Sequence, residues 1–184
     1  MNRRTITIIL WMSIGLVSAA FAEAILKRDL IGSLVISAFL LSLLVLKSLT
    51  NSVAGFAIIS FSAAALFNTA GYRWNLYRAV ESFDEIAHVY SSFAVTLVAG
   101  QLLYARYSES FKNNFLLYLF TIMNTGIVIG VSWELFEWGV AILGDLNDTL
   151  SDLLLDSIGA AAAAAIVGAR ARQSTCRNTN YESS

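Results

Sequence analysis

The run Phe115-Leu-Leu-Tyr-Leu-Phe-Thr-Ile-Met-Asn-Thr-Gly-Ile-Val-Ile-Gly-Val-Ser-Trp133 contains no charged residue. An α-helix rises about 1.5 Å per residue, so a run of this length nearly crosses the hydrocarbon core of a bilayer, which is about 30 Å thick. A helix also satisfies its own backbone hydrogen bonds, as a lipid-embedded segment must. The run therefore predicts a transmembrane helix. The acidic residues that follow it, Glu134 and Glu137, would then lie in the outer part of the membrane.

Similar apolar runs make up most of the chain. Of its 184 residues, 57% are hydrophobic and 14% are charged, and there is no proline. Charged or polar breaks divide the runs into six predicted spans, at residues 5–26, 29–47, 52–70, 84–105, 115–143 and 149–169. The predicted fold class is all-α, a polytopic membrane helical bundle of about six transmembrane helices. One transmembrane domain covers residues 1–172, and a polar, disordered tail covers 173–184.

Composition also limits the partners. The formal net charge is −1 and the basic residues are dispersed, which excludes a nucleic-acid footprint. The single Cys176 allows no intrachain disulfide. Membrane lipids are the expected partners, and the sequence leaves the oligomeric state open. The connection at residues 71–83 carries Trp, Tyr and charged residues, so it is predicted to be an interfacial helix or loop.

Basic residues predict the orientation of the bundle. With the N-terminus inside, eight Lys and Arg residues lie in cytoplasmic segments and four lie outside. This bias predicts a multi-pass protein of the cell membrane with both termini in the cytoplasm and most acidic residues near the outer face. Arg3, Arg4 and the small residues at 19–22 also fit a cleavable secretory signal, whose removal would leave five spans with the same sidedness.

Most of the acidic residues gather in two segments, 81–85 and 134–156, and the first is followed by the only histidine, His88. Asp84 and His88 are four residues apart and share a helix face. The pair Glu134 and Glu137 shares a face of the fifth span, and the row Asp148, Asp152 and Asp156 lies on one face of the sixth. Ionisable side chains inside a membrane turn toward the bundle interior. The three faces are therefore predicted to meet in the same leaflet.

Such a cluster has two chemical uses. Carboxylates at close range repel unless some are protonated or a cation joins them. With a cation, a divalent metal ion (Mg, Mn, Ca or Zn) is expected on Asp84, His88, Glu134, Asp152 and Asp156. Without one, neighbouring protonated and ionised carboxyls provide an acid and a base. The candidate catalytic residues are His88, Glu134 and Glu137.

Several polar residues have structural interpretations instead. Ser82 and Asp148 are candidate helix N-caps, and Asp145 is expected to be a solvated loop acid. Glu23 and Asn68 lie at a depth that would let them join the cluster.

The motifs Asp84-x-x-x-His88, Glu134-x-x-Glu137-Trp138 and Asp148-Thr149-x-x-Asp152-x-x-x-Asp156-x-x-Gly159-Ala160 resemble the YjdF-like and VanZ-like membrane protein families. The resemblance covers about residues 80 to 170. It implies the membrane fold and the same site residues. VanZ-like proteins are associated with glycopeptide-antibiotic resistance and the cell envelope, so the resemblance also implies a role in the envelope.

Three functions remain open from the sequence. The first is a metal- or acid/base-dependent enzyme that acts on an envelope lipid or lipid-linked head group at the outer leaflet. The second is a cation or proton-coupled transporter. Against it, the inner halves of the spans lack ionisable residues, which a pathway to the cytoplasmic face needs. The third is a structural or regulatory membrane subunit without catalysis.

Overall fold

The computed structural model describes residues 2–112, 114–140 and 145–182, with side chains described up to residue 172 except at 109, 110 and 112. Helices form the secondary structure of these residues, and no strand occurs among them. In chain order the helices are α1 (Arg3–Leu26), α2 (Leu30–Ser48), α3 (Gly55–Arg73), α4 (Leu76–Ala79), α5 (Phe83–Lys112), α6 (Phe115–Gly139) and α7 (Leu146–Glu182). Six of them are long and apolar enough to cross a membrane. The predicted polytopic helical bundle is therefore confirmed.

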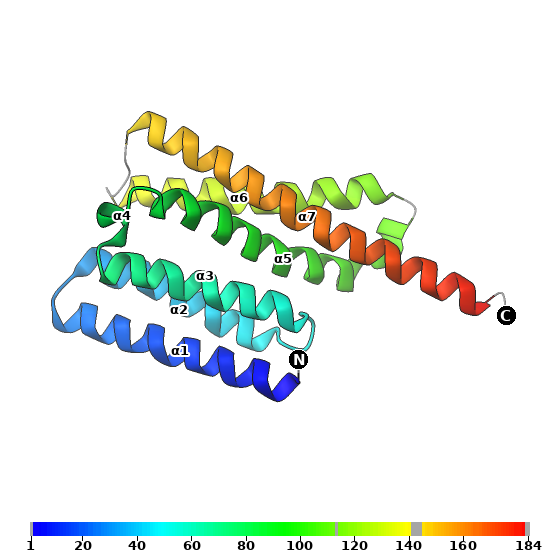
Figure 1. Ribbon diagram of the computed structural model, residues 1–184, viewed down its shortest axis with the longest axis horizontal. Helices are drawn as coiled ribbons and strands as arrows, with labels where there is room; N and C mark the ends of the chain where they lie inside the picture. The colour runs from blue at the N-terminus through cyan, green and yellow to red at the C-terminus, as the bar shows by residue number, and fades with distance from the viewer. Residues whose placement is uncertain (1, 113, 141–144, 183–184) are drawn as a thin grey trace.

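The six long helices form two groups of three (Figure 1). One group contains α1, α2 and α3, and the other contains α5, α6 and α7. Contacts between α3 and α5 join the groups. Inside the second group the packing is close because the facing residues are small, as at the buried Ala94, Ala160 and Ala163.

The outer surface of the bundle is rich in large apolar side chains. Leu26, Leu41, Leu117, Val128 and Leu154 are all more than half exposed. Apolar patches of this extent on a protein surface indicate contact with lipid or another apolar partner. The exposed faces thus agree with the assignment of the six long helices to a membrane.

Several helix ends differ from the predicted spans, and α5 and α7 extend furthest beyond them, to Lys112 and Glu182. Two of the differences concern ends beside the predicted acidic residues. The fifth span was expected to reach residue 143, whereas α6 ends at Gly139; residues 141–144 lie outside the described part of the chain. The sixth was expected to begin at residue 149, with Asp148 as the N-cap. This was wrong, because the Asp145 carboxylate accepts the backbone N–H of Asp148 at 3.0 Å and α7 begins at Leu146. Asp145 therefore caps the helix rather than lying free in a loop.

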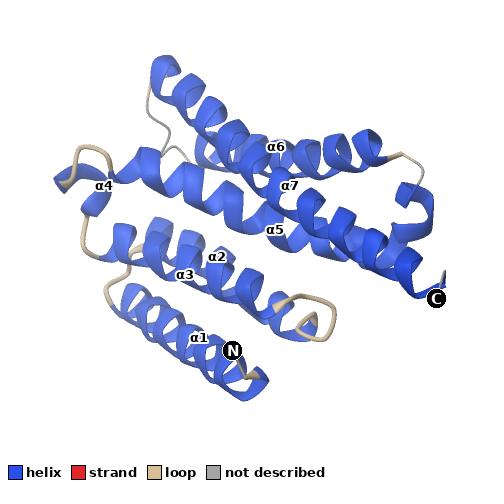
Figure 2. Ribbon diagram, turned by 45° about the vertical axis from the view of Figure 1, so that its right-hand side comes forward, coloured by secondary structure: helices blue, strands red, loops and turns tan. Residues whose placement is uncertain are grey.

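The connection at residues 71–83 is partly helical (Figure 2). Asn75 adopts the left-handed conformation, with φ of 55°, and lets the chain turn from α3 into the short α4. The Tyr77 ring then packs edge-on against Phe83, and its hydroxyl donates to Asn68 Oδ1 at 2.7 Å. The connection is thus anchored to the end of the bundle. Its place at a membrane interface stays a prediction.

Both termini lie at the same end of the bundle, and α4 lies at the other (Figure 1). The first turns of α5 and α7 and the last turns of α6 also lie at the α4 end, since these helices alternate in direction. The predicted site residues occupy those turns, so they lie far from the termini. Which end faces the cytoplasm stays a prediction, as does the mobility of the tail, whose backbone is helical to Glu182.

Candidate functional site

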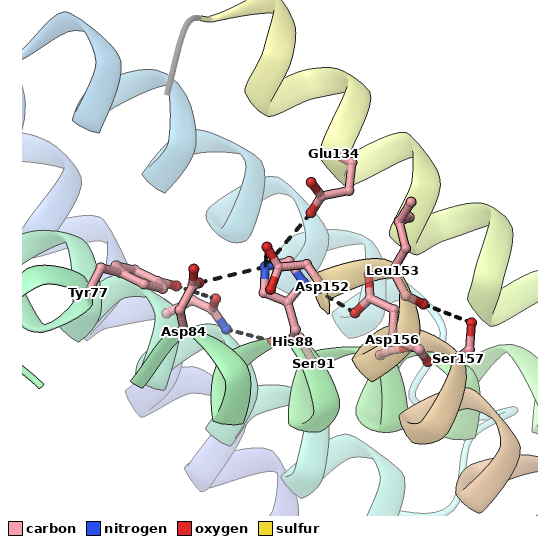
Figure 3. A network of polar contacts seen from close by, with 11 residues as sticks. Tyr77, Asp84, His88, Ser91, Glu134, Asp152, Leu153, Asp156 and Ser157 are labelled. Atoms are coloured by element: carbon pink, nitrogen blue, oxygen red, sulfur yellow. Dashed lines mark hydrogen bonds and ion pairs between the residues drawn. The ribbon is translucent and has the colours of Figure 1, made fainter. Parts of the chain in front are cut away.

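His88 lies at the centre of a cluster of carboxylates (Figure 3). Its side chain is only 7% exposed. The Nε2 atom lies 3.6 Å from Asp84 Oδ1, 3.8 Å from Glu134 Oε1 and 3.9 Å from Asp152 Oδ2. On the other side of the ring, Nδ1 lies 3.4 Å from Asp156 Oδ1. Side chains from α5, α6 and α7 therefore surround one imidazole, as the helix faces predicted; their catalytic and metal-binding roles stay predictions.

Two glycines make room for this arrangement. A Cβ atom at Gly130 on α6 would collide with the Asp156 carboxylate, so only glycine leaves the space that this carboxylate occupies. A Cβ atom at Gly159 on α7 would collide with the backbone carbonyl of Val89, next to His88 on α5. The absence of side chains at these positions lets α6 and α7 approach His88 closely.

Some polar atoms in the cluster have no hydrogen-bond partner. Both carboxylate oxygens of Glu134 are buried without one, and so is Asp156 Oδ2. Glu134 is 5% exposed. A buried polar group without a partner costs roughly 2–7 kcal/mol, and an isolated charge costs more. The site therefore favours a species that pairs with these oxygens, either a proton or a cation.

The geometry fits a cation. Asp84, His88 and Asp152 each offer one ligand atom, and the three atoms lie within 4.8 Å of one another. In a tetrahedral site with bonds of about 2.1 Å, neighbouring ligand atoms lie about 3.4 Å apart. The distances of 3.6 Å and 3.9 Å from His88 Nε2 to the two carboxylates are close to this value. A contraction of the group, by up to about 1.4 Å between the two carboxylates, would bring the three atoms around one ion.

Glu137 lies outside the group formed by Asp84, His88 and Asp152. Its Oε1 atom accepts a hydrogen bond of 3.5 Å from the Tyr72 hydroxyl. It lines a cavity of about 260 Å³ together with Asp84, His88 and Asp156. The candidate acid or base at Glu137 is thus next to the cluster, and its catalytic role stays a prediction.

Glu23 and Asn68, which the sequence allowed to join the cluster, differ in their contacts. Asn68 is buried and lines the same cavity. Its amide nitrogen donates to Ser91 Oγ at 2.8 Å, and its amide oxygen accepts from the Tyr77 hydroxyl. Asn68 therefore supports the cavity wall rather than contacting His88 or its carboxylates. Burial raises the pKa of the Tyr77 hydroxyl, which therefore stays a donor. Glu23 does not join: it forms salt bridges of 2.7 Å with Lys27 and 2.8 Å with Arg73. The side chains of Lys27 and Arg73 therefore hold the Glu23 carboxylate away from the cluster.

Sequence reasoning missed Tyr72, Tyr77, Ser91 and Ser92. The Ser92 hydroxyl donates to the backbone carbonyl of Asp156 at 2.7 Å and ties α5 to α7. A signal for the two serines was present, because they follow His88 by three and four residues on the same helix face. No such signal marked the tyrosines, because Tyr72 lies at the end of α3 and the position of Tyr77 depends on the turn into α4.

A comparison of the whole chain with protein families supports the membrane assignment. The family described as "Predicted membrane protein (DUF2238)" matches residues 5–174, a range that includes every residue of the site. No curated protein and no solved structure matches the chain. Because the family match covers nearly all of the sequence, this protein belongs to the DUF2238 family of predicted membrane proteins.

Proposed function

We propose that this protein is a membrane-embedded enzyme that uses a divalent metal ion to act on an envelope lipid or lipid-linked head group in the outer leaflet. The observation that carries the proposal is the group of Asp84, His88 and Asp152, whose ligand atoms lie within 4.8 Å of one another, with the buried carboxylates of Glu134 and Asp156 beside the same imidazole. Such a group is stable when a cation offsets the repulsion. Intramembrane ionisable residues also mark functional sites in general.

The geometry suggests a role for each residue. Asp84, His88 through Nε2, and Asp152 would hold the ion. Asp156 lies at the opposite ring nitrogen, so it would orient the imidazole rather than bind the ion, unlike the ligand role expected from the sequence. A bound divalent ion would supply Lewis acidity and lower the pKa of a coordinated water.

Glu134 is the best candidate for the general base. It reaches to within 3.8 Å of His88 Nε2 but is not one of the three residues that fit around one ion. Its unpaired oxygens are free to accept the proton of a water molecule. Glu137, on the cavity wall with its Tyr72 donor, would then return a proton to the leaving group.

The position of the cluster favours an enzyme over a transporter. Among the described residues, the buried Asp, Glu, His, Lys and Arg side chains are His88, Glu134, Asp152 and Asp156, and all belong to this cluster. A transporter needs polar groups along a path to the opposite face. The resemblance to VanZ-like proteins of the cell envelope supports a lipid or lipid-linked substrate, and the distribution of basic residues supports the outer leaflet.

Elemental analysis of the purified protein tests the proposal. We expect stoichiometric divalent metal in the wild type, loss of metal in Asp152→Asn, and retention of metal in Glu134→Gln. Glu23→Gln is the matched control, because Glu23 is a carboxylate outside the cluster. In cells that depend on this protein, Asp152→Asn and Glu134→Gln should both lose the phenotype while remaining folded.

Three results would overturn the proposal. If the wild type carries no metal, the ion site is wrong. If Glu134→Gln and His88→Ala both support the phenotype, the cluster is not catalytic and a structural subunit is the better description. Metal-dependent flux of the ion into proteoliposomes would instead establish a transporter.

A further inference from the structure

The cavity beside the cluster extends between the two helix groups. Its walls come mainly from α2, α3, α5 and α6. Much of the wall is apolar, formed by Ala38, Phe61, Ala64, Ala65, Val95 and Ile129. Protein interiors are normally packed without spaces larger than a water molecule. An apolar space of about 260 Å³ inside a bundle of membrane-spanning helices is therefore a candidate binding site.

One side of the cavity lies between two helices that do not pack together. Within the described residues, no Cα atom of α2 comes within 8 Å of α6. The rings of Phe39 on α2 and Trp133 on α6 stack across this gap, with centroids 5.4 Å apart. Both rings line the cavity and both remain partly exposed. They therefore separate the cavity from the outer surface of the bundle.

That outer surface is apolar on both helices. Ile129, one turn before Trp133 on α6, lines the cavity and is 39% exposed, and Ala38, next to Phe39 on α2, lines the cavity and is partly exposed. Side chains of this kind face lipid chains in a membrane protein. Past these two rings, the gap between α2 and α6 thus leads from the cavity to an apolar part of the outer surface of the bundle.

The other end of the cavity is polar. Asp84, His88, Glu137 and Asp156 line it there, and Asn68, Tyr77 and Ser91 form a hydrogen-bonded chain along the adjacent wall. An apolar compartment that ends in a polar cluster complements a lipid, which has a hydrocarbon chain attached to a polar linkage. Water alone is a poor occupant of the apolar part, because a buried water needs two to four polar partners.

We propose that this cavity binds one hydrocarbon chain of a membrane lipid, which enters between α2 and α6 past Phe39 and Trp133 and places the polar linkage beside His88. The inference rests on the proposed function for the identity of the lipid as a substrate. The binding of the chain itself requires only the cavity and its opening. It can therefore be tested separately from metal binding and catalysis.

The test is photocrosslinking of the full-length protein in nanodiscs. Two probes carry a diazirine in the middle of the hydrocarbon chain: a diacyl phospholipid and a single-chain polyprenyl phosphate. Mass spectrometry of the labelled peptides locates each adduct. We expect adducts at cavity residues such as Phe61 and Val95, and the probe that gives more of them identifies the source of the chain.

Substitutions that fill the cavity should remove these adducts. Ala64 is buried on the cavity wall, so Ala64→Phe should abolish labelling inside the cavity. If this variant does not fold, Ser42→Leu narrows the same cavity from α2. Leu154→Phe is the matched control, because Leu154 is 63% exposed and absent from the cavity wall. This control should label like the wild type.

Four outcomes decide between the hypotheses. Labelling confined to the outer surface for both probes overturns the inference, as does unchanged cavity labelling in a folded Ala64→Phe or Ser42→Leu variant. Cavity labelling that persists in Glu134→Gln supports the inference. If that labelling occurs in a protein without metal, the chain site stands and the proposed enzyme fails.

Discussion

The substitution Gly159→Ala tests whether the crossing of α5 and α7 sets the geometry of the site. A Cβ atom at this position would collide with the carbonyl oxygen of Val89 and lie 2.9 Å from the backbone nitrogen of Phe93. Ordinary van der Waals contacts of a Cβ atom begin at 3.4 Å. Both obstacles are backbone atoms, so no rotamer change relieves the overlap, and the two helices must move apart.

The expected loss follows from this overlap. Overpacking of a close contact typically costs about 1–3 kcal/mol. In a protein of this length, that corresponds to a fall in Tm of about 2 to 12 °C. The site should change as well, because His88 directly precedes Val89 and Asp156 lies one turn before Gly159. Separation of the helices would lengthen the 3.4 Å contact between His88 and Asp156, and metal retention should fall.

Thermal unfolding in detergent and metal content after purification measure the two effects. Gly15→Ala and Gly139→Ala are matched controls, because a Cβ atom at either position meets nothing within 4 Å. Both controls should keep the wild-type Tm or exceed it, since alanine is the better helix former. If Gly159→Ala is as stable as these controls and retains its metal, the close crossing of α5 and α7 does not determine the site.

Three further predictions concern topology, the cluster and its support. A reporter fused to the C-terminus should be cytoplasmic, and one inserted at residues 71–83 should be external; the reverse result would contradict the outer placement of the site. In Asp84→Cys with Asp152→Cys, a short bifunctional thiol reagent should crosslink α5 to α7, because these side chains flank the same nitrogen of His88. Tyr77→Phe should lower the free energy of unfolding by about 1–3 kcal/mol by leaving buried Asn68 without its donor. Since the raised pKa keeps the phenol protonated, this loss should be the same at pH 6 and pH 9.

The local polar contacts show where sequence reasoning reaches its limit. The helical spacing of the acidic residues correctly indicated which faces would turn inward. It did not indicate that Asp145 rather than Asp148 would cap α7, because either residue has a side chain suited to the role. It also allowed Glu23 to join the cluster, whereas Arg73 and Lys27 hold Glu23 elsewhere. The choice among such partners depends on distances between segments that are remote in the sequence.

By itself, the sequence determined the class of fold and the number of spans, because a bilayer core accepts helices of a set length whose polar side chains turn inward. It also identified the four carboxylates around His88 through their positions on those helices. Only the tertiary structure decided which ring nitrogen of His88 each carboxylate faces. It also decided that the Tyr77 hydroxyl donates to Asn68 and that a cavity lies between α2 and α6. These features arise from the packing of whole helices, where glycines at 130 and 159 set the distances of closest approach. Hydrophobic periodicity orients each helix toward the interior but contains no information about which neighbour it meets there.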